Sequence, residues 1–96
     1  MKLLTESEIQ AALKKMKGWK LADEGKSIQK DFGFENFTDA VCFLNQVAEI
    51  AEEANHHPDL HLTNYKNLRI VLSTHSDGGV TKKDFILAAK IEEVFL

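Results

Sequence analysis

The sequence has few residues that can form disulfides or interrupt helices and strands, and it has few arginines. Its 96 residues include one cysteine, one proline and one arginine. The lone Cys42 excludes an intrachain disulfide, and its apolar position in a helix-like pattern predicts a small buried side chain in a protein of a reducing cytoplasm. No run approaches the ~18 consecutive apolar residues of a membrane span, and the first residues turn acidic before a signal-peptide core can form. We therefore expect a soluble, cytoplasmic protein with no membrane partner.

Basic residues are not concentrated anywhere along the chain. The formal net charge is −3, the lysines are spread from Lys2 to Lys90, and Arg69 stands within an apolar run. Nucleic-acid-binding domains usually gather basic residues on one face. We expect no direct binding of nucleic acid.

Length and composition fit a single domain over residues 1–96. Hydrophobic residues make up 44% of the chain and charged residues 28%, as in ordinary globular proteins. A domain this small buries only about 60 to 65% of the surface that its unfolded chain exposes, so self-association that buries more is favourable. We expect a homodimer or homotetramer.

Helical and strand-like patterns alternate along the first part of the chain. Thr5 and Glu8 form a capping-box pattern ahead of apolar residues at helical spacing, which predicts a helix over residues 6–17. Apolar residues then alternate with polar ones on both sides of a turn at 23–25, which predicts an antiparallel hairpin. Lys30 falls on the apolar face of this hairpin.

The same order follows in the second half. A wide apolar stripe at helical spacing begins after Asn36, its predicted cap, and we expect Pro58 to end this helix. Alternation over residues 60–72, around a turn near 65–67, predicts a second hairpin.

A third helix closes the predicted fold. Thr81 and Asp84 repeat the capping-box pattern ahead of another apolar stripe. The order is helix, two strands, helix, two strands, helix, and strands joined by short turns must pair antiparallel. We predict an α+β fold in which three helices pack on one face of a four-stranded antiparallel sheet.

Histidines are concentrated at one corner of this predicted fold. His56, His57 and His61 lie within six residues around Pro58. The strand that leaves this corner returns antiparallel, so His75, at the end of the next strand, is expected beside His56 and His57. Repulsion opposes charging several neighbouring imidazoles, and a structural role needs no such cluster. The cluster therefore favours a functional site.

Imidazole suits proton transfer at neutral pH. Its ordinary pKa is about 6.5, so one ring can accept a proton while another donates one, as an elimination, hydration or isomerisation requires. Glu52 and His56 are four residues apart on a predicted helix, and we expect the carboxylate to orient this imidazole. Asp84 is explained by helix capping alone.

Other chemistries fit the sequence less well. Metal binding is an alternative because histidine is a common ligand, but the chain has no HExxH or CxxC pattern, and His61 should face away from its leucine neighbours. Nucleophilic catalysis lacks a GxSxG motif, and Gly78-Gly79 are not followed by the residues of a phosphate-binding loop. We rank metal binding below acid–base catalysis and expect no metal ligands.

The spacing of the polar residues resembles the signature of the pterin-4a-carbinolamine dehydratases. Acidic, imidazole and aromatic residues recur as in that family: Glu52, His56-His57-Pro58, Tyr65, His75 and Asp84. The segments LSTH at 72–75 and GW at 18–19 are similar too, and the order of elements resembles the family over nearly the whole chain.

The resemblance implies an activity and an assembly. Members of the family remove water from a 4a-hydroxytetrahydropterin to give the quinonoid dihydropterin, which recycles the tetrahydrobiopterin-type cofactor of aromatic amino-acid hydroxylases. On this likeness we expect a hydro-lyase that needs no cofactor and takes a pterin as its small-molecule partner. We also expect dimers, often paired into tetramers, formed through helices and sheet edges.

The same likeness implies roles for individual residues. His56 and His75 would transfer protons, one at the departing 4a-hydroxyl and one at ring N5, and His57 would position the pterin; all three are expected to be catalytic. The expected pterin contacts are these histidines with Trp19, Asn55, Ser73, Thr74 and Ser76. The expected supporting residues behind them are Glu52, Pro58 and Asp84.

A second hypothesis belongs to another class of protein. A scaffold or assembly factor could keep this fold and bind a protein partner through its oligomer surface. A pure scaffold has no need of imidazoles at a cleft, so the three histidines favour the enzyme. The transcription-factor binding of the family's animal members is not carried over to this sequence.

Overall fold

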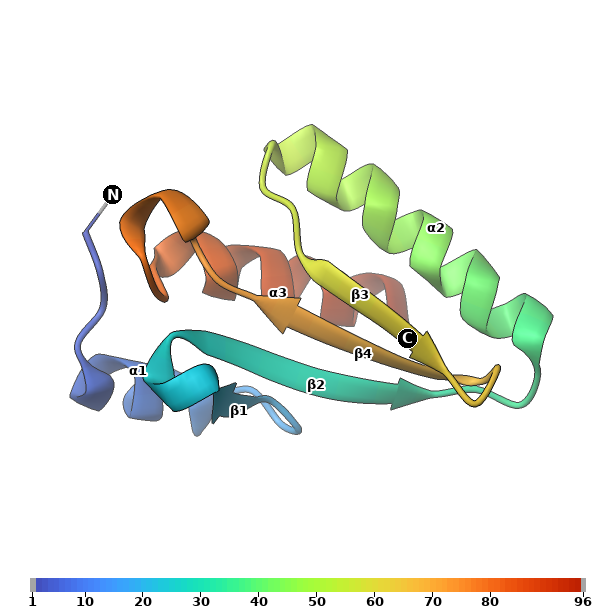
Figure 1. Ribbon diagram of the computed structural model, residues 1–96, viewed down its shortest axis with the longest axis horizontal. Helices are drawn as coiled ribbons and strands as arrows, with labels where there is room; N and C mark the ends of the chain where they lie inside the picture. Colours follow the sequence, from blue (N-terminus) through green and yellow to red (C-terminus); the bar gives the residue numbers. More distant parts are fainter. Residues whose placement is uncertain (1, 96) are drawn as a thin grey trace.

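The computed structural model describes residues 2–95, and these form a four-stranded antiparallel sheet with three helices on one face (Figure 1). The elements follow in the predicted order: α1 (Glu6–Leu13), β1 (Lys20–Ala22), β2 (Ser27–Gly33), α2 (Phe37–Ala54), β3 (Asp59–Thr63), β4 (Asn67–Leu72) and α3 (Lys82–Phe95). Two 3-10 turns, η1 (Asp23–Gly25) and η2 (His75–Asp77), follow β1 and β4. The predicted α+β fold is confirmed.

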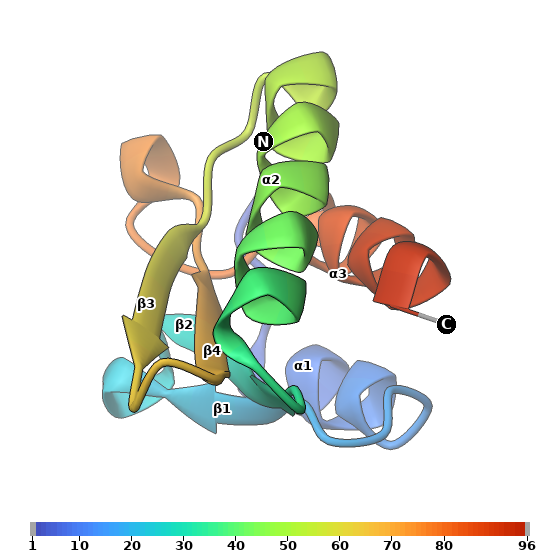
Figure 2. The ribbon, with the colours of Figure 1, turned by 90° about the vertical axis from the view of Figure 1, so that its right-hand side faces the viewer.

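The strand order is β1-β2-β4-β3, so the two hairpins join through β2 and β4 at the centre of the sheet. Alternation along the strands turns one set of apolar side chains toward the helices, and these are fully buried: Ile28, Phe32, Leu68, Ile70 and Leu72. Figure 2 shows α2 and α3 together on that side of the sheet. Asp59 at the start of β3 pairs with Val71 near the end of β4, so the corner after α2 lies beside the end of β4.

The other face of the sheet carries polar side chains. The Asp31 carboxylate accepts hydrogen bonds from Arg69 Nε at 2.7 Å and Nη2 at 3.1 Å. These bonds to the guanidinium hold the pKa of Asp31 below its ordinary value. His61 pairs with Arg69 across β3 and β4 and is exposed on this face, as its alternation with Leu60 and Leu62 predicted.

The first helix is shorter than its sequence pattern predicted. The Thr5–Glu8 capping box is present, but α1 ends at Leu13 instead of residue 17. The N–H groups of Lys15 and Met16 bond to carbonyls three residues back. The last turn before Gly18 is therefore a tighter 3-10 turn and no longer α-helical. Gly18 itself has φ +89° and turns the chain into β1.

Cys42 is exposed, which contradicts the prediction of a buried side chain. The buried face of α2 is formed by Ala40, Phe43, Val47 and Ala51. Cys42 precedes Phe43 and so points about 100° away around the helix. The apolar stripe of the sequence is wider than the face that the core covers.

Lys30 lies on the helix-covered face because its ammonium group has partners there. Its Nζ donates to Glu92 Oε2 at 2.7 Å and to the Lys17 carbonyl at 3.0 Å, and lies 4.9 Å from the ring centre of Phe32. Glu92 Oε2 also accepts a hydrogen bond from Trp19 Nε1 at 3.0 Å. Lys30 therefore ties β2 to α3 and to the turn that precedes β1.

No helix within residues 2–95 is long and apolar enough to cross a bilayer.

Replacing Gly18 with alanine is expected to lower the free energy of unfolding by about 1 to 2 kcal/mol, because a side chain is strained at positive φ. A Cβ at this position would also lie 2.8 Å from Lys30 Cε, so the end of the Lys30 side chain would have to shift. Urea unfolding measures the loss. Gly33→Ala is the control, since a Cβ at Gly33 meets nothing within 4 Å. An equal loss in both variants would contradict this explanation.

Candidate active site

The chain turns sharply at the end of α2 and carries His56 away from the helix. The helix ends at Ala54, ahead of Pro58, which the sequence pattern had predicted as its end. Asn55 takes the left-handed conformation with φ +51°, which asparagine tolerates better than most residues, and the His56 N–H bonds back to the Ala51 carbonyl at 3.1 Å. His56 therefore does not share a helix face with Glu52.

Asp84 orients His56, which corrects the predicted pairing with Glu52. His56 Nε2 lies 2.6 Å from Asp84 Oδ1. The His56 side chain is 11% exposed and that of Asp84 is fully buried. Asp84 stands in the first turn of α3, so the contact joins the start of this helix to the corner that follows α2.

The second oxygen of Asp84 binds groups on either side of η2. Asp84 Oδ2 accepts hydrogen bonds from the Thr81 N–H at 2.9 Å and from Thr74 Oγ1 at 3.0 Å. The hydroxyls of Thr74 and Thr81 lie 2.8 Å apart, and Thr81 Oγ1 accepts from the Lys83 N–H at 3.2 Å. The Asp84 side chain thus caps the helix, as predicted, and also supports the histidine.

His57 pairs with Glu52 at the rim of the site. Its Nε2 lies 2.5 Å from Glu52 Oε2, and the side chains are 59% and 75% exposed. Water screens such an exposed pair, so it contributes little to stability. The contact with Glu52 keeps the His57 ring next to the last turns of α2.

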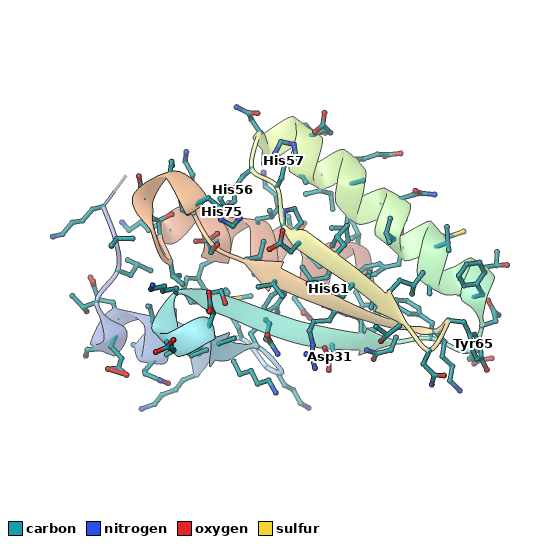
Figure 3. All side chains as sticks on the ribbon, in the orientation of Figure 1. Asp31, His56, His57, His61, Tyr65 and His75 are labelled. Atoms are coloured by element: carbon teal, nitrogen blue, oxygen red, sulfur yellow. The ribbon has the colours of Figure 1, made fainter. Side chains whose placement is uncertain are left out.

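His75 belongs to η2 and not, as predicted, to the end of the strand, because β4 ends at Leu72. The η2 loop is closed by a bond from the Thr74 N–H to the Gly79 carbonyl at 2.7 Å. Since Thr74 also contacts Asp84, the loop is anchored at the carboxylate that holds His56. In the view of Figure 3, His56 and His75 fall in the same corner of the molecule, with His57 at the end of α2.

The histidine corner, as we call His56, His57 and His75, is flanked by several of the other predicted residues. Asn55 precedes His56, Pro58 leads into β3, and Ser73 and Ser76 stand on either side of the Thr74–His75 pair. His61 and Tyr65 lie elsewhere, His61 along the sheet and Tyr65 at the far hairpin tip (Figure 3).

Trp19 lies in the core, away from this corner. Its ring packs edge-on against Phe32, with 6.1 Å between ring centres, and its Nε1 bonds to Glu92. Glu92 is about two helical turns along α3 from Asp84. The structure therefore does not bring Trp19 together with the histidines.

The arrangement suits proton transfer. A buried imidazole held by a carboxylate can receive a proton on its free nitrogen, while a second, exposed imidazole stands nearby. Within residues 2–95, no group of three or more histidine, cysteine or acidic side chains is arranged to hold a metal ion. The two histidine–carboxylate pairs, His56 with Asp84 and His57 with Glu52, share no residue.

Comparison with known proteins connects this geometry to a family. The sequence pattern of the family described as Pterin 4 alpha carbinolamine dehydratase matches residues 2–94. The chain belongs to the pterin-4a-carbinolamine dehydratase family.

Individual members of the family are similar over nearly the whole chain. A Gloeobacter violaceus protein, provisionally named pterin-4-alpha-carbinolamine dehydratase 2, is 47% identical over 93 residues, which are 95% of this chain and 100% of that protein. Pterin-4-alpha-carbinolamine dehydratase 2, mitochondrial, of Arabidopsis thaliana is 42% identical over 96 residues, which cover 98% of this chain and 51% of that longer protein. Because that relative's name places it in mitochondria, the cytoplasmic location of this protein stays a prediction.

Solved structures share the fold. A transcriptional coactivator/pterin dehydratase from Brucella melitensis superposes with a TM-score of 0.90 at 36% identity, covering 97% of this chain and 98% of that one. A pterin dehydratase-like protein described as a RuBisCO assembly factor of the alpha-carboxysome superposes with a TM-score of 0.67 over 81% of this chain and 89% of that one. At 19% identity, the second likeness shows the fold alone.

Sequence reasoning missed Thr81 as part of the candidate site. The Thr81-Lys82-Lys83-Asp84 pattern was fully explained by a helix cap. A carboxylate has two oxygens, however, and capping the Thr81 N–H uses only one of them. The unassigned oxygen was the available signal that Asp84 has a further partner.

Asp84→Ala is expected to lower the free energy of unfolding by about 3 kcal/mol, because it leaves the buried partners of two carboxylate oxygens unsatisfied. Glu52→Ala is the matched control: it also removes a carboxylate from a histidine, but an exposed one, and should change stability by less than about 0.5 kcal/mol. Urea unfolding of both variants measures the difference. Equal losses would contradict the assignment of Asp84 as the central buried carboxylate.

Proposed function

We propose that this protein is a dehydratase that removes water from 4a-hydroxytetrahydropterin by acid–base catalysis at His56, His57 and His75. The observation that carries the proposal is the histidine corner itself, in which the exposed His75 directly follows Thr74, whose hydroxyl bonds to the carboxylate of the buried His56–Asp84 pair. Membership of the family supports a pterin carbinolamine as the substrate.

The chemistry requires two proton transfers. A general acid protonates the 4a-hydroxyl so that it leaves as water when the C4a–O bond breaks, and a base removes the proton from N5 as the C4a–N5 double bond of the quinonoid dihydropterin forms. Water leaves without a change in oxidation state, so no redox cofactor takes part. We assign one transfer each to His56 and His75, because an imidazole can both accept and donate a proton at neutral pH.

The surrounding residues have supporting parts. Asp84 stabilises the His56 ring when it carries a positive charge, because a fully buried carboxylate is weakly screened. His57, held by Glu52 at the rim, positions the pterin, with Asn55 and the backbone of residues 73–76 as hydrogen-bonding groups. We assign Trp19 to the core, since it packs there on Phe32.

The product places the reaction in cofactor recycling. A quinonoid dihydropterin must be reduced to regenerate a tetrahydropterin, and a 4a-hydroxytetrahydropterin is formed when an aromatic amino-acid hydroxylase uses that cofactor. We propose that the protein acts after such a hydroxylase in the cytoplasm.

His56→Ala and His75→Ala are each expected to reduce catalysed dehydration at least about 100-fold, because each removes a proton-transfer group. The measurement is the ultraviolet absorbance decay of enzymatically generated 4a-hydroxytetrahydropterin at neutral pH, with EDTA present. His61→Ala is the matched control, since His61 is the fourth histidine and is exposed on the open face of the sheet. Decay no faster than the spontaneous rate with folded wild-type protein would overturn the proposal and favour the scaffold hypothesis.

We also propose that the protein forms a homo-oligomer through α2. Beside the buried face of this helix runs a second apolar stripe at spacings of four, three and four residues: Phe37, Val41, Leu44 and Ala48. Phe37 is 54% exposed. Heptad spacing of this kind is typical of helices that pack against another helix, and a second copy of α2 offers the matching surface.

Ala48→Lys is expected to dissociate the oligomer into a species of lower mass, because it places a charge within the α2 stripe without touching the core. Size-exclusion chromatography with light scattering measures the mass. Gln46→Lys, on an exposed position about 160° away around the helix, is the control and should keep the wild-type mass. An unchanged mass for Ala48→Lys would exclude this stripe as the contact between copies.

A further inference from the structure

The hydrogen bonds around Asp84 can be followed donor by donor. The Lys83 N–H donates to Thr81 Oγ1, and Thr74 Oγ1 donates its proton to Asp84 Oδ2. Because the single Thr74 proton is used on Asp84, the contact between the two hydroxyls must run from Thr81 to Thr74. The result is a one-way chain of donors that ends on the carboxylate.

The chain of donors decides what the other carboxylate oxygen can do. Oδ2 accepts both the Thr74 hydroxyl and the Thr81 N–H, and two such bonds stabilise the ionised carboxylate. Oδ1 is then an acceptor as well, so His56 Nε2 must carry the proton in the 2.6 Å contact. The one ring nitrogen of His56 left to take up a proton is Nδ1.

We propose that Thr74 and Thr81 are positioning residues, which fix the Asp84 carboxylate so that His56 holds its proton on Nε2 and offers Nδ1 for proton transfer to the substrate. All three supporting side chains are nearly or fully buried, so solvent does not compete for these bonds. The part that concerns the substrate rests on the proposed dehydratase function. The assignment of the tautomer does not.

The Asp84→Asn variant tests whether the Asp84 carboxylate holds the His56 proton on Nε2. Both Thr81 N–H and Thr74 O–H are donors aimed at one position, so the amide oxygen of the asparagine should occupy the place of Oδ2. The amide NH₂ would then face His56 Nε2, which would have to become an acceptor. The same exchange in the Ser-His-Asp triad leaves the geometry intact and gives the wrong histidine tautomer. We expect His56 to move its proton from Nε2 to Nδ1.

The tautomer is measured by two-bond ¹H–¹⁵N correlation spectra of histidine-labelled protein, recorded at increasing pH until the ring signals stop changing. Wild type and Thr74→Ser should show the proton on Nε2, and Asp84→Asn on Nδ1. A backbone spectrum like that of the wild type establishes that each variant is folded. Retention of the Nε2 proton in folded Asp84→Asn, or an Nδ1 proton in the wild type, would overturn the inference.

Kinetics supply a second, independent test. Thr74→Val keeps the shape of the side chain but removes the donor, and should lower kcat about tenfold or more with little change in KM, whereas Thr74→Ser should restore the wild-type kcat. An unchanged kcat for Thr74→Val would overturn the positioning role and leave the proposed function intact. Because the spectra need no substrate, they decide the tautomer even if no dehydratase activity is found, and the kinetics decide the role if Asp84→Asn does not fold.

Discussion

The rest of the candidate site depends on the hydrogen bonds of the buried Asp84 carboxylate. It lies in the first turn of α3 and binds the turn before that helix, the η2 loop through Thr74, and the corner after α2 through His56. A buried carboxylate without partners is strongly unfavourable, so each of these segments must be in place for the charge to be accommodated. One side chain thereby fixes the relative positions of three segments that are distant in the sequence.

This arrangement couples folding to chemistry. Removing a partner of Asp84 is expected to weaken the packing of α2, η2 and α3 and also to displace the His56 ring, to which we assign a proton transfer. The pair formed by Glu52 and His57 differs, because both side chains are exposed and water can replace either partner. The two histidine–carboxylate pairs thus use the same chemical groups, yet burial holds one pair in place and leaves the other adjustable at the rim of the histidine corner.

Periodicity predicted the elements well, whereas local spacing predicted the contacts poorly. The alternation of apolar residues placed both hairpins and turned His61 to the open face, because strand period is a local property. The pairing of Glu52 with His56 failed because it assumed a helix that continues to Pro58, and a single left-handed residue, Asn55, ended it earlier. The contact between His56 and Asp84 spans 28 positions in the sequence and depends on how α3 packs on α2, which no spacing rule contains.

A carboxylate that caps a helix can also hold a side chain of the candidate site. A capping carboxylate satisfies a helix N-terminus with one oxygen and leaves the other free to accept a proton-bearing group from elsewhere in the fold. Here the loop that delivers His75 passes directly before that helix, and its Thr74 hydroxyl bonds to the capping carboxylate. The cap, the loop and the oriented imidazole therefore form one hydrogen-bonded unit, in which the residues that begin α3 also decide how His56 can exchange its proton.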